Sequence, residues 1–256
     1  MPKNLAEWHA LPDTLMLTDD DVHVWRASLA LSSPWLQHLR STLVADELHR
    51  ALRFHFQVDR ERFIAARGLL RIILARYLDL EPGQLRFSYG PGGKPWLAPG
   101  QAAGGLSFNL SHSHDLALFA FARGREVGVD VERVGRDVLE KGLAERFFAP
   151  GEVAALQALP PDRQVEAFYH VWTCKEAYLK ARGEGLLVPL DEFEVSVNPD
   201  APAALLRVQG DPGETHRWSL RTLYPTGQLD AAPVYVGALA VAGHDWRLRC
   251  WQWDPV

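Results

Sequence analysis

The pattern of apolar and polar positions in the first half of the chain predicts strands around one long helix. Residues 22–30 alternate well enough for a strand. Residues 41–55 have a helical pattern, and residues 59–79 predict a long helix because apolar side chains recur at helical spacing. Asp59 is a suitable N-cap for that helix. Residues 106–122 form two apolar segments separated by SHSHD, which predicts two strands with a tight link.

The second half opens on a buried strand and then contains a second long helix. Residues 125–137, REVGVDVERVGRD, predict a strand that emerges into a loop. A long helix is expected over residues 162–182, where Gly183 and Gly185 stop it. Two shorter helical stretches precede it, 137–148 and 150–158. Strand-like segments complete the chain at 191–197, 203–209, 216–223, 233–242 and 246–253.

The two halves therefore share one plan, a long helix followed by strands. ERFIAARGLLR and EAFYHVWTCKEAYLK also have a similar apolar pattern. We take a duplicated α+β unit as the hypothesis, with an N-terminal subdomain over residues 1–124 and a C-terminal subdomain over residues 125–256. Each subdomain would pack its long helix on a small, mostly antiparallel sheet.

Composition narrows the class of protein without naming a function. The chain has 256 residues, enough for one large or two small domains, and 47% of them are apolar. A net charge of −5 argues against wholesale binding of nucleic acid. Two cysteines make neither a disulfide framework nor a zinc cluster. The N-terminus does not resemble a signal peptide, and no apolar run is long enough for a membrane span, so we expect a cytoplasmic protein.

The segment GVDVE is the first candidate for chemistry. Asp130 and Glu132 are two positions apart in a predicted strand, so both side chains point to the same face. One interpretation is a solvated strand end. The other is a binding site for Mg²⁺, which takes one or two carboxylates together with substrate phosphates and water. The buried character of the preceding strand residues favours the second interpretation.

The predicted helix 162–182 contains the second candidate set. Trp172, Glu176 and Lys180 are spaced four residues apart and share one face, and Lys175 flanks them. The simple interpretation is an exposed Glu–Lys pair, which contributes about 0.3–0.5 kcal/mol. Alternatively, a third acid completes the metal site, and a lysine neutralises a phosphate or protonates a leaving group.

Polar residues of the first half also admit two interpretations. In the segment SFNLSHSH, the candidates for either turn formers or phosphate ligands are Ser107, Asn109, Ser111 and His112. The turn at Gly92-Gly93-Lys94-Pro95 is either a simple hairpin or a close approach to a ligand. The arginines of the first helices are either surface residues or a phosphate clamp: Arg50, Arg53, Arg62 and Arg67. The residues alone thus indicate a divalent-metal site for a phosphorylated ligand between two α+β halves.

These segments resemble the signature of the 4′-phosphopantetheinyl transferases. GVDVE, followed about 40 residues later by WTCKEAYLK, fits the two signature blocks at every position. FNLSHS and GGKPWL resemble two further blocks in the expected order. The resemblance covers about residues 45 to 195, and the chain length is similar to that of the long, monomeric, surfactin-type branch.

The resemblance implies two similar subdomains related by a pseudo-twofold axis, with coenzyme A in the cleft between them. It implies Mg²⁺-dependent transfer, with Mn²⁺ as an alternative ion, of 4′-phosphopantetheine from coenzyme A to a serine of an acyl or peptidyl carrier protein. Adenosine 3′,5′-bisphosphate is released. The implied setting is fatty acid, polyketide or nonribosomal peptide biosynthesis, with a monomeric enzyme and a transient carrier partner.

Carried over position by position, the resemblance assigns the metal to Asp130, Glu132 and Glu176. Glu176 would also be the general base, directly or through a bound water. Lys180 would stabilise or protonate the leaving phosphate, and Lys175 would contact phosphate or orient Glu176.

The resemblance also assigns the coenzyme A contacts. Ser111 and His112 match positions that touch the 3′-phosphate, and Lys94 matches one near the adenine. Asp130, Lys175 and Lys180 would lie on the pyrophosphate side, and the basic residues for the 3′-phosphate would be Arg50, Arg53 and Arg62.

Two other functions fit the same residues. A Mg²⁺-dependent phosphohydrolase would use water as the nucleophile and act on coenzyme A or nucleotides without a carrier. A non-catalytic relative would only bind coenzyme A. Loss of Glu176 or Lys180 would have favoured the latter, but both are present.

Overall fold

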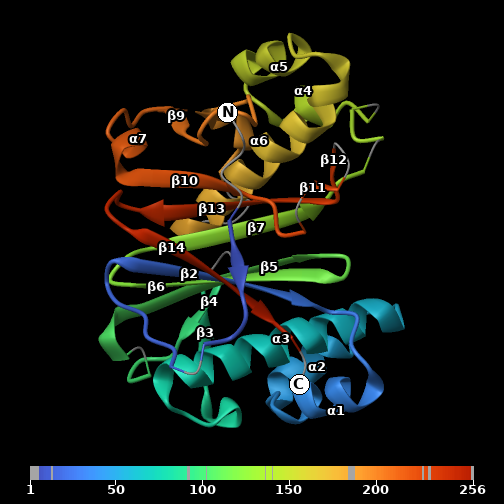
Figure 1. Ribbon diagram of the computed structural model, residues 1–256, viewed down its shortest axis with the longest axis vertical. Helices are drawn as coiled ribbons and strands as arrows, with labels where there is room; N and C mark the ends of the chain where they lie inside the picture. Colours follow the sequence, from blue (N-terminus) through green and yellow to red (C-terminus); the bar gives the residue numbers. More distant parts are fainter. Residues whose placement is uncertain are drawn as a thin grey trace.

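The computed structural model describes residues 6–12, 14–90, 93–101, 103–135, 137–139, 141–183, 188–226, 228–229 and 232–254. Two long helices, α3 (Gln57–Leu78) and α6 (Pro161–Arg182), lie on opposite outer faces with the sheets between them (Figure 1). Each half therefore has a long helix on a small sheet, and the α+β prediction is confirmed.

The first half contains these further elements: β1 (Trp8–His9), β2 (Asp21–Ser28), α1 (Ser33–Ser41), α2 (Ala45–Ala51), η1 (Pro82–Gln84), β3 (Phe87–Tyr89), β4 (Pro95–Leu97), η2 (Ala103–Gly105), β5 (Leu106–Ser113) and β6 (Leu116–Arg123). The second half contains β7 (Val127–Arg133), α4 (Leu143–Phe147), α5 (Pro150–Gln157), η4 (Leu190–Glu192), β8 (Phe193–Val195), β9 (Leu205–Val208), α7 (Glu214–Arg217), β10 (Trp218–Leu223), β11 (Gln228–Leu229), β12 (Ala232–Pro233), β13 (Tyr235–Ala242) and β14 (Arg247–Trp253).

The helices of the first half differ in part from the prediction. The expected helical region 41–55 is wrong in extent, because two short helices, α1 and α2, are present instead, and α1 begins well before it. The long helix is confirmed, but its N-cap is Phe56. Asp59 lies in the first turn, where its negative charge interacts favourably with the positive end of the helix dipole.

The second half shows a similar mixture. Helices α5 and α6 are confirmed, and Gly183 ends α6 in the left-handed conformation with φ 76°. Gly185 and Gly92 lie outside the described residues. The predicted helix 137–148 is wrong over its first part, because residues 137–139 form a turn and α4 is short. The predicted strand 216–223 begins only at Trp218, after the short helix α7.

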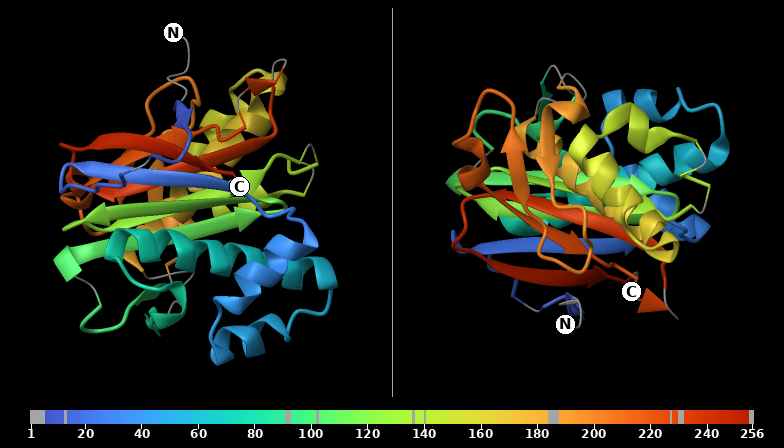
Figure 2. Two further views of the ribbon diagram at one scale, coloured as in Figure 1. Left: turned by 60° about the horizontal axis from the view of Figure 1, so that its bottom comes forward. Right: turned by 90° about the horizontal axis from the view of Figure 1, so that it is seen from above.

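Two main sheets form the centre of the molecule. The first has the order β1-β14-β2-β6-β5 and the second the order β10-β13-β7. The strand β14 pairs in parallel with β2 of the first half (Figure 2). In this pair, Cys250 lies opposite Val24. The division at residue 124 stays a prediction, but the C-terminal strand is structurally shared with the first sheet.

The two sheets pack on each other through apolar side chains. One buried cluster joins Val22 and Val24 of β2 with Val129 and Val131 of β7. Separate clusters lie beneath α3 and α6. Burial of each such side chain contributes about 1.5–3 kcal/mol, so the cluster between the sheets holds the two halves together. This packing fixes the position of β7 relative to β5.

Candidate active site between two sheet edges

The edge strands β5 and β7 face each other and are joined by side chains. Every second residue of β5 points toward β7, as strand geometry requires. The hydrogen bonds run from Val129 N to Asn109 Oδ1 (2.9 Å), from Ser111 Oγ to Asp130 Oδ1 (2.8 Å) and from Ser113 Oγ to Glu132 Oε2 (2.7 Å). The turn-former interpretation of these polar residues is therefore wrong. They lie within a strand and hold both acids of GVDVE in place.

Gly128 lets the helix α6 lie directly on β7. A Cβ atom at this position would be 2.1 Å from the carbonyl oxygen of Ala177 and 2.3 Å from the backbone nitrogen of Ala181. Only glycine accommodates such a close approach of a helix backbone. The approach brings Lys180 of α6 to Asp130 of β7, with Nζ 2.5 Å from Oδ1. Lys180 of the helix α6 therefore forms its ion pair with a residue of the strand β7.

The carboxylate of Asp130 is buried, and only one of its two oxygens has a hydrogen-bond partner among the described residues. Its exposed fraction is 2%. Oδ1 accepts from Ser111 Oγ and from Lys180 Nζ, whereas Oδ2 has no hydrogen-bond partner among the residues that the structure describes. A buried oxygen without a partner costs about 1–3 kcal/mol, and more when the group is charged. A cation placed against Oδ2 would remove this cost.

The two remaining acids lie in the same electrostatic environment. Burial raises the pKa of Glu132, and the negative charges of Asp130 and Glu176 raise it further. Burial also raises the pKa of Glu176, again with Asp130 as the next cause. The charge of Asp130 thus acts on both glutamates, as expected for acids that are near neighbours. Within the described ranges, however, no three His, Cys, Asp or Glu side chains are already arranged as metal ligands.

Lys175 lies away from these acids, which corrects its expected role. Its side chain is fully buried, and Nζ donates to the carbonyl oxygens of Leu190 (2.7 Å) and Phe193 (2.5 Å). It also pairs with Glu152 of α5 at 2.8 Å. Adjacent helix positions point in different directions, and Glu176 shares its face with Lys180, which pairs with Asp130 of β7. Lys175 therefore fastens α6 to α5 and β8 and does not contact phosphate in this arrangement.

A pocket of about 380 Å³ opens beside the acids and collects several of the predicted ligand contacts. Its walls come from α2, α3, the β3–β4 hairpin, β5 and the end of α6. The candidate residues of the sequence that line it are Arg50, Arg67, Lys94, Asn109, Ser111, His112 and Lys180. They come from five separate segments of the chain, and four of the seven are arginine or lysine.

Other predicted contacts lie elsewhere or are already engaged. Among the described residues that line the pocket, Arg53 and Arg62 are missing, and Arg62 pairs with Asp115 at 2.8 Å. Lys94 lines the pocket, but its Nζ donates to the carbonyl oxygens of Val127 and Ala181, each at 3.1 Å. Burial lowers the pKa of Lys94 to about 8. Lys94 thus connects the hairpin to the second half.

His112 lines the pocket next to cationic side chains. Desolvation, followed by the charges of Lys180 and Arg62, lowers its pKa. An anion at this position would reverse the effect of those charges, as expected for a group that contacts phosphate.

Sequence reasoning missed Tyr89 and Glu47. Tyr89 lines the pocket, and Glu47 is buried behind it. The sequence contained one usable signal, an acid in the helical segment 41–55 one helical turn before Arg50, but no local pattern indicates that such an acid is buried.

Comparisons with known proteins identify the family of this chain. The model of the 4′-phosphopantetheinyl transferase superfamily matches residues 126–236, and that of the 4′-phosphopantetheinyl transferase N-terminal region matches residues 25–123. The 4′-phosphopantetheinyl transferase HetI of a Nostoc species is 44% identical over 96% of this chain and 98% of the relative. The 4′-phosphopantetheinyl transferase Sfp of Bacillus subtilis is 31% identical over 68% of this chain and 75% of the relative.

Solved structures show a partial likeness. The holo-[acyl-carrier-protein] synthase of Thermotoga maritima is 26% identical, with a TM-score of 0.36 over 46% of this chain and 62% of that one.

Proposed function

This chain belongs to the 4′-phosphopantetheinyl transferase superfamily, and we propose that Asp130, Glu132 and Glu176 act on coenzyme A bound in the adjacent pocket. The enzyme transfers the 4′-phosphopantetheine group from coenzyme A to a serine of a carrier protein. The serine oxygen forms a bond to the phosphorus of the phosphopantetheine arm, and the bond from this phosphorus to the oxygen of the other phosphate breaks. The serine proton is lost, and adenosine 3′,5′-bisphosphate leaves.

The unpartnered Oδ2 of Asp130 is the observation on which the site assignment rests. It lies beside two further acids whose pKa values are raised by burial and by negative charge. Oxygen ligands of this kind suit Mg²⁺, and Mn²⁺ accepts similar ligands. When bound, the ion would neutralise the diphosphate of coenzyme A. Asp130, Glu132 and Glu176 would hold it.

The remaining steps belong to the side chains of the chain itself. Glu176, with its raised pKa, is suited to accept the proton of the serine hydroxyl. Lys180 lies against Asp130 and Ser111, so its ammonium group is positioned to stabilise or protonate the departing phosphate oxygen. Arg50 and His112 line the pocket where the remaining phosphate charge would lie.

The test is an incubation with coenzyme A, MgCl₂ and an apo carrier protein, followed by intact-protein mass spectrometry. We expect the carrier to gain one phosphopantetheine group and adenosine 3′,5′-bisphosphate to appear in equal amount. A carrier with its acceptor serine replaced by alanine is the control. Hydrolysis of coenzyme A with an unmodified carrier would identify a phosphohydrolase, and binding without turnover would identify a non-catalytic relative. Omission of MgCl₂ and its replacement by MnCl₂ test the metal.

The assembly is also part of the proposal. We expect a monomer, because both pocket walls come from one chain. Light scattering after size exclusion would test this, and a dimer whose dissociation removes activity would contradict it. None of the described helices is both long enough and apolar enough to cross a membrane. A panel of apo acyl and peptidyl carriers assayed side by side would identify the preferred partner.

A further inference from the structure

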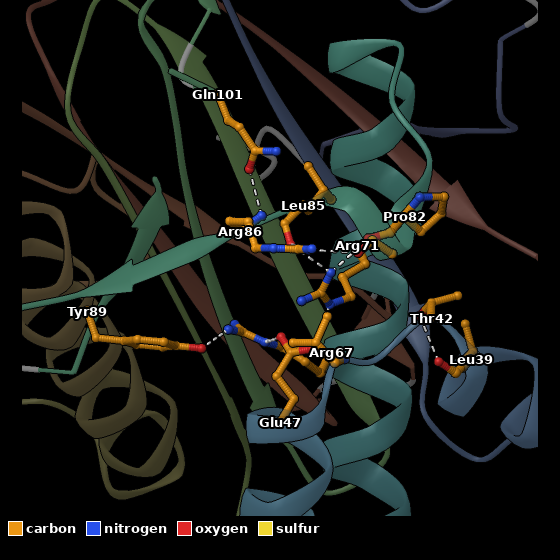
Figure 3. Close-up of polar contacts among 12 residues, drawn as sticks. Leu39, Thr42, Glu47, Arg67, Arg71, Pro82, Leu85, Arg86, Tyr89 and Gln101 are labelled. Carbon is orange, nitrogen blue, oxygen red and sulfur yellow. Dashed lines mark hydrogen bonds and ion pairs between the residues drawn. The ribbon is translucent and has the colours of Figure 1, made fainter. Parts of the chain in front are cut away.

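Behind the pocket, one buried carboxylate holds two arginines of the helix α3. Glu47 of α2 has an exposed fraction of 2%. Its Oε1 lies 2.5 Å from Nε of Arg67, and its Oε2 lies 2.6 Å from Nε of Arg71 (Figure 3). One carboxylate thus pairs with two guanidinium groups, so the cluster of Glu47, Arg67 and Arg71 has a net charge of one positive unit.

The two arginines point in different directions. Arg71 is fully buried and donates through Nη1 to the carbonyl oxygens of Pro82 (2.7 Å) and Leu85 (3.2 Å), away from the pocket. Arg67 lines the pocket and donates through Nη2 to the hydroxyl of Tyr89. Figure 3 shows the resulting chain from Glu47 through Arg67 to Tyr89. The excess positive charge therefore faces the pocket.

Tyr89 is an exposed aromatic residue that is nevertheless fixed at both ends. It ends β3, opposite Pro95 of β4, and its exposed fraction is 39%. The hydroxyl at the other end of the side chain is held by Arg67, whose guanidinium stacks on Phe87 with 4.3 Å between its carbon and the ring centroid. A fixed ring in an open pocket offers a flat surface at little cost in conformational entropy.

We propose that Tyr89 is the wall on which the purine ring of coenzyme A stacks, and that Glu47 positions this wall through Arg67. The inference rests on the proposed function. A flat ring beside the basic residues Arg50, Lys94 and His112 fits a ligand with one aromatic ring and several phosphates, which describes the nucleotide end of coenzyme A. Stacking of a base on an aromatic side chain depends on the orientation of that side chain. Glu47 does not contact the ligand, so it is a positioning residue.

Calorimetric titration with adenosine 3′,5′-bisphosphate tests the wall without a carrier or any transfer. This nucleotide has the purine and the phosphates but lacks the pantetheine arm. We expect Tyr89→Ala to weaken the binding of this nucleotide and of coenzyme A about tenfold, by the same factor. In Tyr89→Ala, the KM for coenzyme A should rise by a similar factor, while kcat stays within twofold of the wild-type value. Tyr89→Trp should restore most of the affinity.

The matched control is Trp96→Ala, which removes an exposed aromatic side chain from the partner strand β4. Trp96 has an exposed fraction of 46% and does not belong to the described lining of the pocket. We expect its nucleotide affinity to equal that of the wild type. An equal loss in Trp96→Ala and Tyr89→Ala would overturn the proposal, because the effect would then reflect the hairpin as a whole.

A double-mutant cycle tests the positioning role. Glu47→Gln should weaken nucleotide binding about as much as Tyr89→Phe, and the double variant should show no further loss, because both changes release the same ring. Additive losses would overturn the role of Glu47. If Glu47→Gln does not fold, Arg67→Lys replaces it in the same cycle with the same two outcomes.

The two proposals can fail separately. Wild-type protein that binds the nucleotide through Tyr89 but transfers nothing to any carrier would contradict the proposed function alone. Transfer with full nucleotide affinity in Tyr89→Ala would contradict the stacking wall alone.

Discussion

Nζ of Lys180 lies 2.5 Å from Oδ1 of Asp130, although the two residues belong to different elements, α6 and β7. The lysine has an exposed fraction of 28% and the aspartate of 3% in their side chains. The pair therefore sits at the boundary between the core and the pocket. It leaves Oδ2 of Asp130 for a cation and keeps the ammonium group next to the place where a phosphate would arrive.

Lys180→Ala should slow the chemical step more than it weakens coenzyme A binding. Removal of a group that stabilises or protonates a leaving phosphate lowers kcat by about 100-fold, whereas Arg50 and His112 still line the pocket. Steady-state kinetics and calorimetry on the same preparation would separate the two effects. Lys141→Ala is the control, because that lysine is 58% exposed and pairs only with Asp137 among the described residues. A normal kcat with a raised dissociation constant would contradict the leaving-group role.

Asp130→Asn and Glu176→Gln should each reduce Mg²⁺-dependent transfer by more than about 100-fold while the protein stays folded. Both changes keep the size of the side chain and remove its negative charge. Circular dichroism would confirm the fold, and calorimetric titration with MgCl₂ in the presence of coenzyme A would report the metal. Asp20→Asn, at an exposed acid outside the site, is the control. Near-normal turnover in either variant would mean that the metal ligands are elsewhere.

The raised pKa of Glu132 predicts a specific dependence of stability on pH. A carboxyl whose pKa is higher in the folded state binds its proton more tightly there. Its stabilising contribution is complete below the ordinary value of 4.5 and is lost as the pH rises through the raised value. In metal-free buffer, Glu132→Gln should therefore become progressively more stable relative to the wild type as the pH rises from 4 toward neutral.

Denaturant unfolding of both proteins at several pH values measures this difference. Glu145→Gln, a variant of an exposed acid, is the control and should show a constant difference from the wild type. MgCl₂ with coenzyme A should reverse the trend, because a bound cation favours the ionised carboxylate. A variant that loses relative stability with rising pH would give the opposite sign and refute the electrostatic account of the site.

Gly128→Ala should disturb the site through the backbone. The added methyl group would lie 2.1 Å from the carbonyl oxygen of Ala177, so α6 has to move away from β7. We expect a loss of at least about 1–3 kcal/mol in the free energy of unfolding and a parallel loss of kcat. Gly83→Ala is the matched control, since a Cβ atom there meets nothing within 4 Å. Equal stability of the two variants would show that α6 does not lie against β7 as described.

The sequence predicted the acids of the site better than the directions of its lysines. GVDVE places Asp130 and Glu132 on one face because strand side chains alternate, and the hydrogen bonds from β5 agree with this. In α6, helical spacing fixes which residues share a face but not which face meets the sheet. The resemblance implies that Lys175 contacts phosphate or orients Glu176, whereas its side chain pairs with Glu152.

Local sequence patterns do not predict which distant segments pair with each other. The alternation in β14 predicts a strand but not its partner, and the partner β2 lies at the other end of the chain. The same holds for Glu47, whose burial depends on Arg67 and Arg71 in another helix. An acid with two buried guanidinium partners has the same local sequence as a solvated one.

Lys175→Met should lower stability and leave the kcat of the folded protein unchanged. The lysine is fully buried and pairs at 2.8 Å with Glu152, which has an exposed fraction of 2% and also accepts from the backbone nitrogens of Val195 (2.7 Å) and Ala149 (2.9 Å). Removal of one partner leaves a buried, uncompensated charge, which costs about 3–5 kcal/mol.

Denaturant unfolding of Lys175→Met would measure its stability. Steady-state rates divided by the concentration of titrated active sites would give the kcat of the folded fraction. Lys141→Met, at an exposed ion pair, should cost less than about 1 kcal/mol. Replacement of Glu152 as well, in Lys175→Met/Glu152→Leu, should recover part of the lost stability, because no unpaired charge then remains in the core. A stable Lys175→Met variant with a strongly reduced kcat would instead place this lysine among the residues that act on phosphate.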